Sequence, residues 1–448
     1  MALSGLDIYK LLPRTNCKKC GFQTCLAFAM QLAKRAVALD KCPFVSGEVR
    51  GILEAASQPA IRLIEIGTGE QKCLVGNETV LFRHEEKFYH PTAIGFIIED
   101  DATSAELENA LDEVLGLSFE RVGQKIGVEL IALREKSRNI KQFVKMLNTV
   151  ITKTQLGLVL MPASKDSLRA ALEICAGRRP LVYCSEPRDM DGFLSICKEY
   201  KVPLAFKAQS LDDFSAASKK AIQQGQADLV FHVSSDKESE CLWQLTQIRR
   251  LSIKKNERSL GFPTMVIIED EDEPKGVAKA AGHIAKYASI VLLKTRKPEY
   301  ILPLLTLRQN IFTDPQKPLQ VEPKVYPVGL ACDRSPVLVT TNFSLTYYTV
   351  LGEIESSRVP AHLICLDTEG MSVLTAWAAE KFTPERISDT LIKFKLSDIV
   401  KHKNLIIPGY VAMMSGDLEE KSGWNILVGP REAAGLPSFL KNLSTTMH

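Results

Sequence analysis

The chain has 448 residues, 45% of them hydrophobic, and its 56 Lys and Arg residues nearly balance its 53 Asp and Glu residues. Because single hydrophobic cores rarely exceed about 250–300 residues, we expect two to four domains. The balanced charge gives no support for nucleic acid or an anionic membrane as a partner. The first residues lack the basic-then-apolar pattern of a secretion signal and no apolar run has transmembrane length, so a soluble, cytoplasmic protein is expected.

Four of the eleven cysteines lie within 26 positions near the start of the chain, with the spacing C-x2-C-x4-C-x16-C. Four converging thiolates need a metal centre, and the choices are a [4Fe–4S] cluster or a structural zinc ion. Three close cysteines and a distant fourth suit a cubane better than the paired knuckles of a zinc ribbon. Buried thiols without a metal are a further alternative. The pattern favours an electron-transfer cluster, and its predicted ligands are Cys17, Cys20, Cys25 and Cys42.

Residues 1–57 are expected to form this cluster module, which is too small for a large core and should gain much of its stability from the metal. The segment Gln23–Leu39 is predicted to be a helix with an apolar face formed by Leu26, Met30, Ala33 and Val37. Residues 58–92 are predicted to be a small antiparallel β element made of IRLIEIG, KCLVG and TVLF, with Gly76-Asn77 as a hairpin turn.

Between residues 93 and 311, short apolar runs alternate with amphipathic stretches of helical length, such as Ser104–Leu115, Ser164–Ala176 and Leu211–Gln224. Eight strand–helix units in these 219 residues have the count and length of a (β/α)8 barrel, also called a TIM barrel, and an open doubly wound sheet is the alternative. The predicted strands are Ile94–Ile98, Val128–Leu133, Leu158–Leu160, Leu181–Tyr183, Pro203–Phe206, Leu229–Val233, Met265–Ile268 and Ile290–Leu293.

Active sites on such barrels lie beyond the C-terminal ends of the strands. Here those ends carry Glu99-Asp100-Asp101, Arg134-Glu135 and the acidic run Glu269–Glu273. A carboxylate cluster could bind a metal or a cationic group, but no histidine accompanies it, and solvated loop charge is the favoured interpretation. The pattern therefore assigns no chemistry to the barrel.

Residues 312–327 contain four prolines and are expected to be an extended, fairly stiff linker. Residues 328–448 are then expected to form a second α/β domain, in which each predicted strand ends at a small polar or glycine-rich loop. Glycines at such ends let backbone N–H groups approach a flat or anionic cofactor, and structural turns are the alternative. Neither G-x-G-x-x-G nor G-x-x-x-x-G-K-[ST] occurs, which disfavours dinucleotides and triphosphates. The predicted strands are Val337–Thr340, Leu363–Leu366, Leu405–Ile407 and Ile426–Val428.

Along its full length the chain resembles the large (gamma) subunit family of the corrinoid iron–sulfur proteins of the acetyl-CoA pathway. The resemblance is carried by NCKKCGFQTC…DKCP, VTTNFSLTYYTVLGEIE, LDTEGMSVLTAWAAEKF, NLIIPGYVAMMSGDLEE and VGPREAAGLPSFLK. It implies an N-terminal [4Fe–4S] module, a TIM barrel and a C-terminal Rossmann-like domain that binds a cobamide. The four-cysteine motif is shared with other redox proteins, so the C-terminal phrases are the specific part.

The function that the resemblance implies is that of a methyl carrier, not of a stand-alone enzyme. Cobalt(I) takes a methyl group from methyltetrahydrofolate through a separate methyltransferase and delivers it to acetyl-CoA synthase/CO dehydrogenase. The cluster, supplied by a low-potential donor such as ferredoxin, repairs cobalt(II), and a small subunit with its own barrel completes a heterodimer. Carried over by position, the corrinoid contacts fall on Thr340, Thr346, Gly370, Met371, Ser372, Val373 and Ala433.

One absence agrees with this resemblance. Many cobalamin proteins use D-x-H-x-x-G, whose histidine ligates cobalt, but the motif does not occur here, and His362 and His402 lie outside the glycine-rich loops. Because cobalt(I) prefers no axial donor, a missing histidine eases the reduction of cobalt(II). Two other functions stay open: an iron–sulfur flavoprotein that passes electrons to a flavin, and a barrel methyltransferase that binds the pterin itself.

Overall fold

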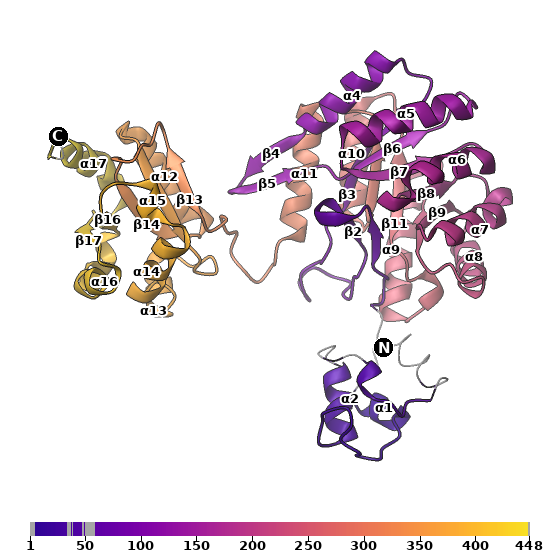
Figure 1. Ribbon diagram of the computed structural model, residues 1–448, viewed down its shortest axis with the longest axis horizontal. Helices are drawn as coiled ribbons and strands as arrows, with labels where there is room; N and C mark the ends of the chain where they lie inside the picture. Colours follow the sequence, from indigo (N-terminus) through magenta and orange to yellow (C-terminus); the bar gives the residue numbers. More distant parts are fainter. Residues whose placement is uncertain (1–4, 34–36, 38, 47–48, 50–58, 447–448) are drawn as a thin grey trace. The chain divides into compact units, whose positions relative to one another are not determined.

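The computed structural model describes the whole chain except residues 1–4, 34–36, 38, 47–48, 50–58 and 447–448 (Figure 1). The chain forms two compact units, one made of residues 1–119 and 127–312, the other of residues 120–126 and 313–448. No helix in the described ranges is both long and apolar enough to cross a membrane.

The N-terminal module contains α1 (Gly5–Leu11), α2 (Cys25–Ala33) and the 3-10 turn η1 (Leu39–Lys41). Helix α2 is shorter than predicted, and most of the predicted C-terminal turns lie outside the described residues. The predicted apolar face is wrong, because Leu26 and Met30 are exposed whereas Phe28 and Leu32 are buried. Helix α2 is apolar on nearly every side, so spacing alone could not select the face that packs on α1.

A short hairpin precedes the barrel. Strands β1 (Ile64–Ile66) and β2 (Cys73–Val75) pair in antiparallel register, with Ile64 opposite Val75. The third predicted strand, TVLF at residues 79–82, does not form, so Gly76-Asn77 is not a hairpin turn. Instead the buried Arg249 of α9 (Glu238–Lys254) donates to the carbonyl oxygen of Val80 and pairs with Glu78 at 2.9 Å. The segment at residues 78–80 is therefore held by the side chain of Arg249 on a barrel helix and not by a neighbouring strand.

Eight parallel strands form the closed barrel that the sequence predicted, and the parallel pairing of β12 with β3 joins the last barrel strand in chain order to the first. The strands are buried along almost their whole length, which explains their continuous apolar runs. In order around the barrel they are β10 (Leu229–His232), β11 (Thr264–Ile268), β12 (Ile290–Leu293), β3 (Ala93–Glu99), β6 (Leu130–Arg134), β7 (Gly157–Met161), β8 (Leu181–Cys184) and β9 (Leu204–Lys207).

Helices follow the strands in alternation (Figure 1). Polar N-caps start several of them; Thr103 forms a reciprocal capping box with Glu106 at α4, and Ser210 does the same with Asp213 at α8. The barrel helices are α4 (Ser104–Gly116), α5 (Ile140–Lys153), α6 (Lys165–Cys175), α7 (Met190–Tyr200), α8 (Leu211–Gln223), α9, α10 (Glu273–Ala285) and α11 (Pro298–Phe312).

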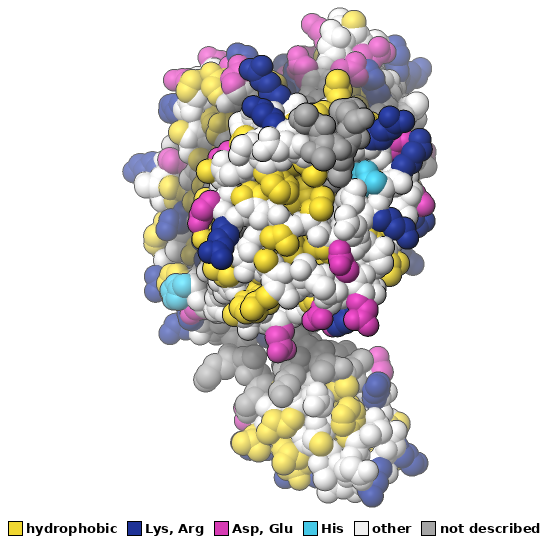
Figure 2. All heavy atoms as spheres, turned by 90° about the vertical axis from the view of Figure 1, so that its left-hand side faces the viewer, with side chains coloured by type: hydrophobic (Ala, Val, Ile, Leu, Met, Phe, Trp, Pro, Cys, Tyr) yellow, Lys and Arg dark blue, Asp and Glu magenta, His cyan; other side chains and the backbone are white. Residues whose placement is uncertain are grey.

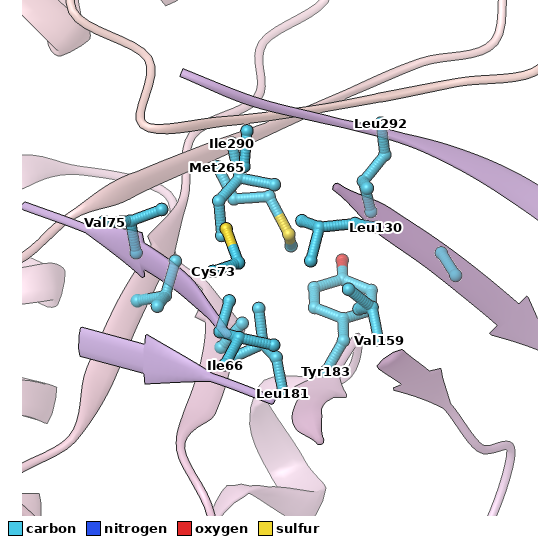
Figure 3. Close-up of a cluster of buried hydrophobic side chains, with 14 of the residues drawn as sticks. Ile66, Cys73, Val75, Leu130, Val159, Leu181, Tyr183, Met265, Ile290 and Leu292 are labelled. Carbon is cyan, nitrogen blue, oxygen red and sulfur yellow. The ribbon is translucent and has the colours of Figure 1, made fainter. Parts of the chain in front are cut away.

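The β1–β2 hairpin completes the barrel core. Figure 3 shows Ile66, Cys73 and Val75 of the hairpin among side chains of the barrel interior such as Leu181 and Met265. These side chains belong to one buried cluster together with residues from the barrel strands. The hairpin therefore supplies part of the core of the barrel.

The C-terminal unit has a five-stranded sheet in the order β13-β15-β14-β16-β17. The four predicted strands are present as β14 (Val337–Thr341), β15 (Ala361–Leu366), β16 (Asn404–Ile407) and β17 (Asn425–Val428), all mutually parallel. Helices α12 (Ser344–Ser357) and α17 (Leu436–Thr446) share one buried cluster with the sheet. Helices α13 (Val373–Ala378), α14 (Pro384–Lys393), α15 (Leu396–Ile399) and α16 (Ser415–Ser422) share another.

The predicted linker needs correction. Strand β13 (Val325–Val328) overlaps it and pairs antiparallel with β15, while Val321 is buried and Gln320 forms a bridge with Phe343. This segment is thus an edge of the sheet. Proline is tolerated at a sheet edge, where its missing N–H faces away from the neighbouring strand.

A second hairpin, β4 (Ser118–Arg121) and β5 (Gln124–Gly127), was not predicted. It lies between α4 and β6 in the chain, yet residues 120–126 at its tip belong to the same compact unit as residues 313–448. Val122 is part of that unit's core, and the left-handed Gly123 lies so close to Tyr326 and Val321 that a Cβ would overlap both.

Candidate functional site

The cysteine-rich loop is tightly turned around Cys17 and Cys20. Asn16, Lys18 and Gly21 all have positive φ angles, and the Gly21 N–H donates to the carbonyl oxygen of Lys18 at 2.9 Å. The side-chain oxygen of Asn16 accepts from the backbone N–H of Cys25 at 2.8 Å, which ties the loop to the first turn of α2. The sequence reasoning missed this role of Asn16.

The four predicted ligands are only partly gathered. Cys25 and Cys42 are buried in one apolar cluster with the half-buried Cys20 at its edge, whereas Cys17 is exposed. Among the described residues, no three His, Cys, Asp or Glu side chains are close enough to hold a metal ion. The Lys19 N–H and the Thr15 hydroxyl, which hydrogen-bond to Cys17, lower the pKa of its thiol. Four thiols in one small module, one of them with a lowered pKa, fit a four-thiolate centre in donor chemistry.

At the C-terminal ends of the barrel strands, the predicted carboxylates have structural partners. The fully buried Asp100 accepts hydrogen bonds from the Lys136 N–H at 2.7 Å, the Ser137 N–H at 2.8 Å and the Ser137 hydroxyl at 2.6 Å. Glu135 accepts from the Ala163 N–H at 2.7 Å and the Ser167 hydroxyl at 2.9 Å. Both side chains connect neighbouring strand-end loops.

Several of the remaining carboxylates of the barrel mouth form ion pairs. Arg134 pairs with Glu99 and Glu269, and Lys136 lies 2.8 Å from Glu99. Asp270 is 2.6 Å from Lys279, and that hydrogen bond lowers the pKa of the Asp270 carboxyl. These contacts agree with the favoured interpretation of the acidic residues as structural and solvated charge.

A buried polar pair in the barrel was missed by the sequence reasoning. The Tyr183 hydroxyl lies 2.7 Å from Nδ1 of His232, at the C-terminal ends of β8 and β10. Burial, with further contributions from Lys207 and Arg134, lowers the pKa of His232 to about 3, and burial raises the pKa of Tyr183. The histidine is therefore neutral in the folded protein at neutral pH.

The C-terminal unit has a cavity of about 420 Å³ beyond the ends of β14, β16 and β17. Its wall is mainly apolar, with Leu338, Val350, Ile406 and Leu436 among the lining residues. Five of the seven predicted corrinoid contacts line it: Thr340, Thr346, Ser372, Val373 and Ala433. The position matches the rule that open α/β sheets bind ligands beyond the carboxyl ends of their strands.

Thr340 is the most informative residue of the wall. Its side chain is buried, 1% exposed, and its hydroxyl has no hydrogen-bond partner among the described residues. Burying a hydroxyl without a partner costs about 1–3 kcal/mol. A ligand in the cavity could provide the missing partner, so this orphaned atom fits a bound cofactor.

Residues at the cavity mouth were also missed. The Tyr410 hydroxyl donates to the Glu432 carboxylate, which raises the pKa of Tyr410. Leu345 and Leu374 line the same cavity and are 67% and 46% exposed. Figure 2 shows hydrophobic side chains exposed on one face of the molecule. No spacing in the sequence links residues 410 and 432, because they follow two different strands.

Gly370 and Met371 are not on the cavity wall. Gly370 has a φ of +76°, and a Cβ there would lie 2.8 Å from Cγ of Gln320 and 3.2 Å from the carbonyl oxygen of Pro318. Met371 packs half-buried against the core of the sheet. The two residues remain predicted cofactor contacts, but a side chain at position 370 would first meet residues 318–320, contrary to the expectation that it would stand against a ligand.

The two histidines of the C-terminal unit that lie within the described residues have structural partners. Nε2 of His362 lies 3.0 Å from the carbonyl oxygen of Cys332, and Nε2 of His402 lies 2.9 Å from that of Ser335. His362 is near the start of β15 and His402 precedes β16, so both are at the strand ends opposite to the cavity.

The chain is similar to known proteins along nearly its full length. A family model for the CO dehydrogenase/acetyl-CoA synthase delta subunit matches residues 63–440, and an Fe-S cluster model matches residues 12–44. The chain is 43% identical to the corrinoid/iron-sulfur protein large subunit of Moorella thermoacetica, covering 98% of this chain and 99% of that one. It is 35% identical to the acetyl-CoA decarbonylase/synthase complex subunit gamma of Methanothermobacter thermautotrophicus, covering 99% and 100%. The chain therefore belongs to the family of corrinoid/iron–sulfur protein large subunits and acetyl-CoA decarbonylase/synthase gamma subunits.

Proposed function

We propose that the protein is the methyl carrier of the acetyl-CoA pathway, with a cobamide in the C-terminal unit and a [4Fe–4S] cluster in the N-terminal module. The observation that carries the proposal is the buried Thr340 hydroxyl, which has no partner in the described structure and lies on the wall of the strand-end cavity. The names of the relatives, which specify a corrinoid and an iron–sulfur centre, support the identity of the two groups.

The residues that would hold the cobamide are Thr340, Thr346, Ser372, Val373 and Ala433 on the cavity wall, with Gly370 and Met371 of the same loop as further predicted contacts. A complete cobamide is larger than the 420 Å³ cavity, so the cavity accepts only part of it. The apolar wall excludes water, and the exposed Leu345 and Leu374 offer flat apolar contacts at the mouth. When bound, the cobamide supplies a reduced cobalt that accepts a methyl group, and the cluster supplies single electrons.

Among the described residues of the C-terminal unit, no histidine lies at the strand ends that carry the cavity. His362 and His402 contact backbone carbonyl oxygens at the opposite strand ends. A site without a histidine donor would favour the lower oxidation states of cobalt, which would suit a carrier that must be reduced before it is methylated.

The partners follow from the open cavity and from the family. The relatives are subunits of larger assemblies by name, which supports a small-subunit partner and the acetyl-CoA synthase complex. We propose that the small subunit covers the mouth of the cavity in a heterodimer. A methyltetrahydrofolate:corrinoid methyltransferase then supplies the methyl group, and a low-potential donor such as ferredoxin supplies electrons to the cluster that Cys17, Cys20, Cys25 and Cys42 would hold.

The direct test is metal analysis of the anaerobically purified heterodimer, with Cys20→Ala as the variant. We expect about four iron atoms and one cobalt per large subunit, without zinc, and corrinoid absorption bands that a flavin lacks. Cys20→Ala should lose the cluster, keep methyl transfer from chemically reduced cobalt, and lose recovery from cobalt(II) through a protein donor. Stoichiometric flavin without cobalt would instead support an iron–sulfur flavoprotein. Loss of methyl transfer with preformed cobalt(I) and an intact fold would contradict the repair role of the cluster.

A further inference from the structure

Asn342 follows β14 directly and is completely buried. Its side-chain oxygen accepts three hydrogen bonds from the loop after β15, each at 3.0 Å: from the Thr368 N–H, the Thr368 hydroxyl and the Gly370 N–H. Its amide nitrogen donates to the side chains of Gln320 and Asp367, each at 3.3 Å. One side chain thus joins the end of β14, the loop after β15 and the edge segment before β13.

The loop held by Asn342 is not in a conformation that it would adopt without support. Glu369 and Gly370 both have positive φ angles, of 56° and 76°. Such backbone costs energy at a non-glycine residue and persists where the surroundings enforce it. The same loop continues into Ser372 and Val373, which are on the cavity wall.

Resting on the proposed function, we propose that Asn342 is the positioning residue of the cofactor site: it holds the loop Asp367–Val373 so that Ser372 and Val373 meet the cobamide. It does this without lining the cavity itself. Neither aspartate nor leucine can replace it, because the position needs an acceptor for three donors and also a donor toward Asp367. Asparagine has both on a side chain short enough to stay buried.

The variants separate these two needs. Asn342→Leu keeps the size but leaves the Thr368 and Gly370 amides without their acceptor. Asn342→Asp keeps the acceptor and sets a carboxylate against Asp367, and Asn342→Asp with Asp367→Asn restores a donor–acceptor pair. Thr341→Val is the matched control on the same strand: its hydroxyl is buried, has no partner among the described residues, and is not on the cavity wall. Thr340→Val tests the cavity itself.

Two measurements are made on the full heterodimer after removal of the corrinoid: cobamide affinity by titration, and hydrogen exchange of the Thr368 and Gly370 amides without cofactor. We expect about a hundredfold weaker binding and faster exchange for Asn342→Leu, and about tenfold weaker binding for Asn342→Asp. The swapped pair should recover most of the affinity, and Thr341→Val should retain it. The iron content should stay unchanged throughout.

The inference is overturned if Asn342→Leu keeps the affinity and exchange rates of the parent while Thr340→Val weakens binding. It is also overturned if the swapped pair binds no better than Asn342→Asp. If Thr340→Val and Asn342→Leu both bind cobamide like the parent although exchange at Gly370 is faster, the cofactor lies elsewhere. In that case the proposed site fails, and the role of Asn342 at that site fails with it.

Discussion

The barrel and the C-terminal sheet both present the carboxyl ends of parallel strands, but the two sets of strand ends differ in their surroundings. At the barrel mouth, Asp100 and Glu135 accept hydrogen bonds from neighbouring loops and Arg134 pairs with two carboxylates. At the strand ends of the C-terminal sheet, a cavity of about 420 Å³ contains a buried hydroxyl without a partner in the described structure. Nε2 of His232 and the hydroxyl of Ser234 also lack partners at the barrel strand ends, so the cavity beside the unpartnered hydroxyl is what marks the C-terminal unit as the candidate site.

The difference also explains why charge was a poor guide in this chain. The most acidic loop, Glu269–Glu273, contributes an ion pair with Arg134 and another with Lys279. The cavity wall is mainly apolar, and its lining includes one basic and one acidic residue, Arg431 and Glu432, of which the second accepts from Tyr410. A large cofactor with a flat macrocycle is held mostly by apolar surface and a few polar atoms, so its site does not stand out by charge.

The largest effect should come from a pair of matched substitutions, one at each edge. Ala433 lines the cavity and Ala102 follows β3 at the barrel mouth, and both are half-buried. We expect Ala433→Phe to fill part of the cavity and weaken cobamide binding more than about a hundredfold, because the ring takes the space of the cofactor. Ala102→Phe should leave binding unchanged. Equal losses from both, measured by titration of the cobalt-free heterodimer, would remove the contrast between the two edges.

A second prediction concerns stability of the barrel. Asp100→Ala removes the acceptor of three hydrogen bonds at a fully buried position, so the free energy of unfolding of the barrel should fall by about 1–3 kcal/mol. Asp100→Asn keeps an acceptor and should lose less. Cobamide affinity should be the same in both variants, which chemical denaturation and titration can check together. A loss of affinity without a loss of stability would give the barrel mouth a role in binding.

A third prediction uses pH. The pKa of His232 is about 3 in the folded barrel, below the value of about 6.5 in an unfolded chain, so the unfolded state binds the extra proton first. The stability contributed by the neutral histidine is complete above pH 6.5 and is lost as the pH falls from 6.5 toward 3, by at most about 1.4 kcal/mol per pH unit. His283, with a pKa lowered to about 4 by burial, acts in the same direction.

Hydrogen exchange at the β10 amides of the full-length protein can follow this loss, and His232→Gln should flatten the pH dependence. An unchanged slope in the variant would mean that other groups cause it.

The smallest effect is expected at Ser372. Its hydroxyl lies on the cavity wall but is already 3.0 Å from the hydroxyl of Thr375. Ser372→Ala should therefore weaken cobamide binding by tenfold or less, corresponding to one hydrogen bond of about 0.5–1.5 kcal/mol. Titration of the variant beside Thr340→Val ranks the two hydroxyls. A stronger effect at Ser372 than at Thr340 would mean that the Ser372 hydroxyl, and not the Thr340 hydroxyl, is the main hydrogen-bond partner of the ligand.

Much of the fold could be predicted because its strands are buried on both faces. Continuous apolar runs such as Ile290–Leu293 are typical of strands that are buried on both faces. All twelve predicted strands of the barrel and the C-terminal sheet are present. Strand β13 was missed because the sequence VYPV, with its proline and its edge position, lacks that continuous pattern. The prediction of the buried face of α2 was wrong because the helix is apolar on nearly every side.

The site was predictable at the level of loops and not at the level of contacts. Glycine-rich strand ends indicated the strand ends at which the cavity lies, and five of the seven named residues line that cavity. Gly370 was carried over from the resemblance as a cofactor contact, whereas the space that a side chain would need there is occupied by Gln320. Asn342 and the Tyr410–Glu432 pair depend on segments that meet only after folding, so no local pattern marks them.

The tip of the β4–β5 hairpin makes the C-terminal unit discontinuous along the gene. Val122 packs in a core whose other buried members lie between Val321 and Leu440, so the ribosome produces this piece long before the domain that it completes. A fragment starting at Thr313 would have all five strands and the whole cavity, but an apolar notch where Val122 belongs. Transplanting the cofactor unit into another protein therefore requires moving two separate stretches of coding sequence. A fusion that carries residues 313–448 alone should be prone to aggregation at the exposed notch.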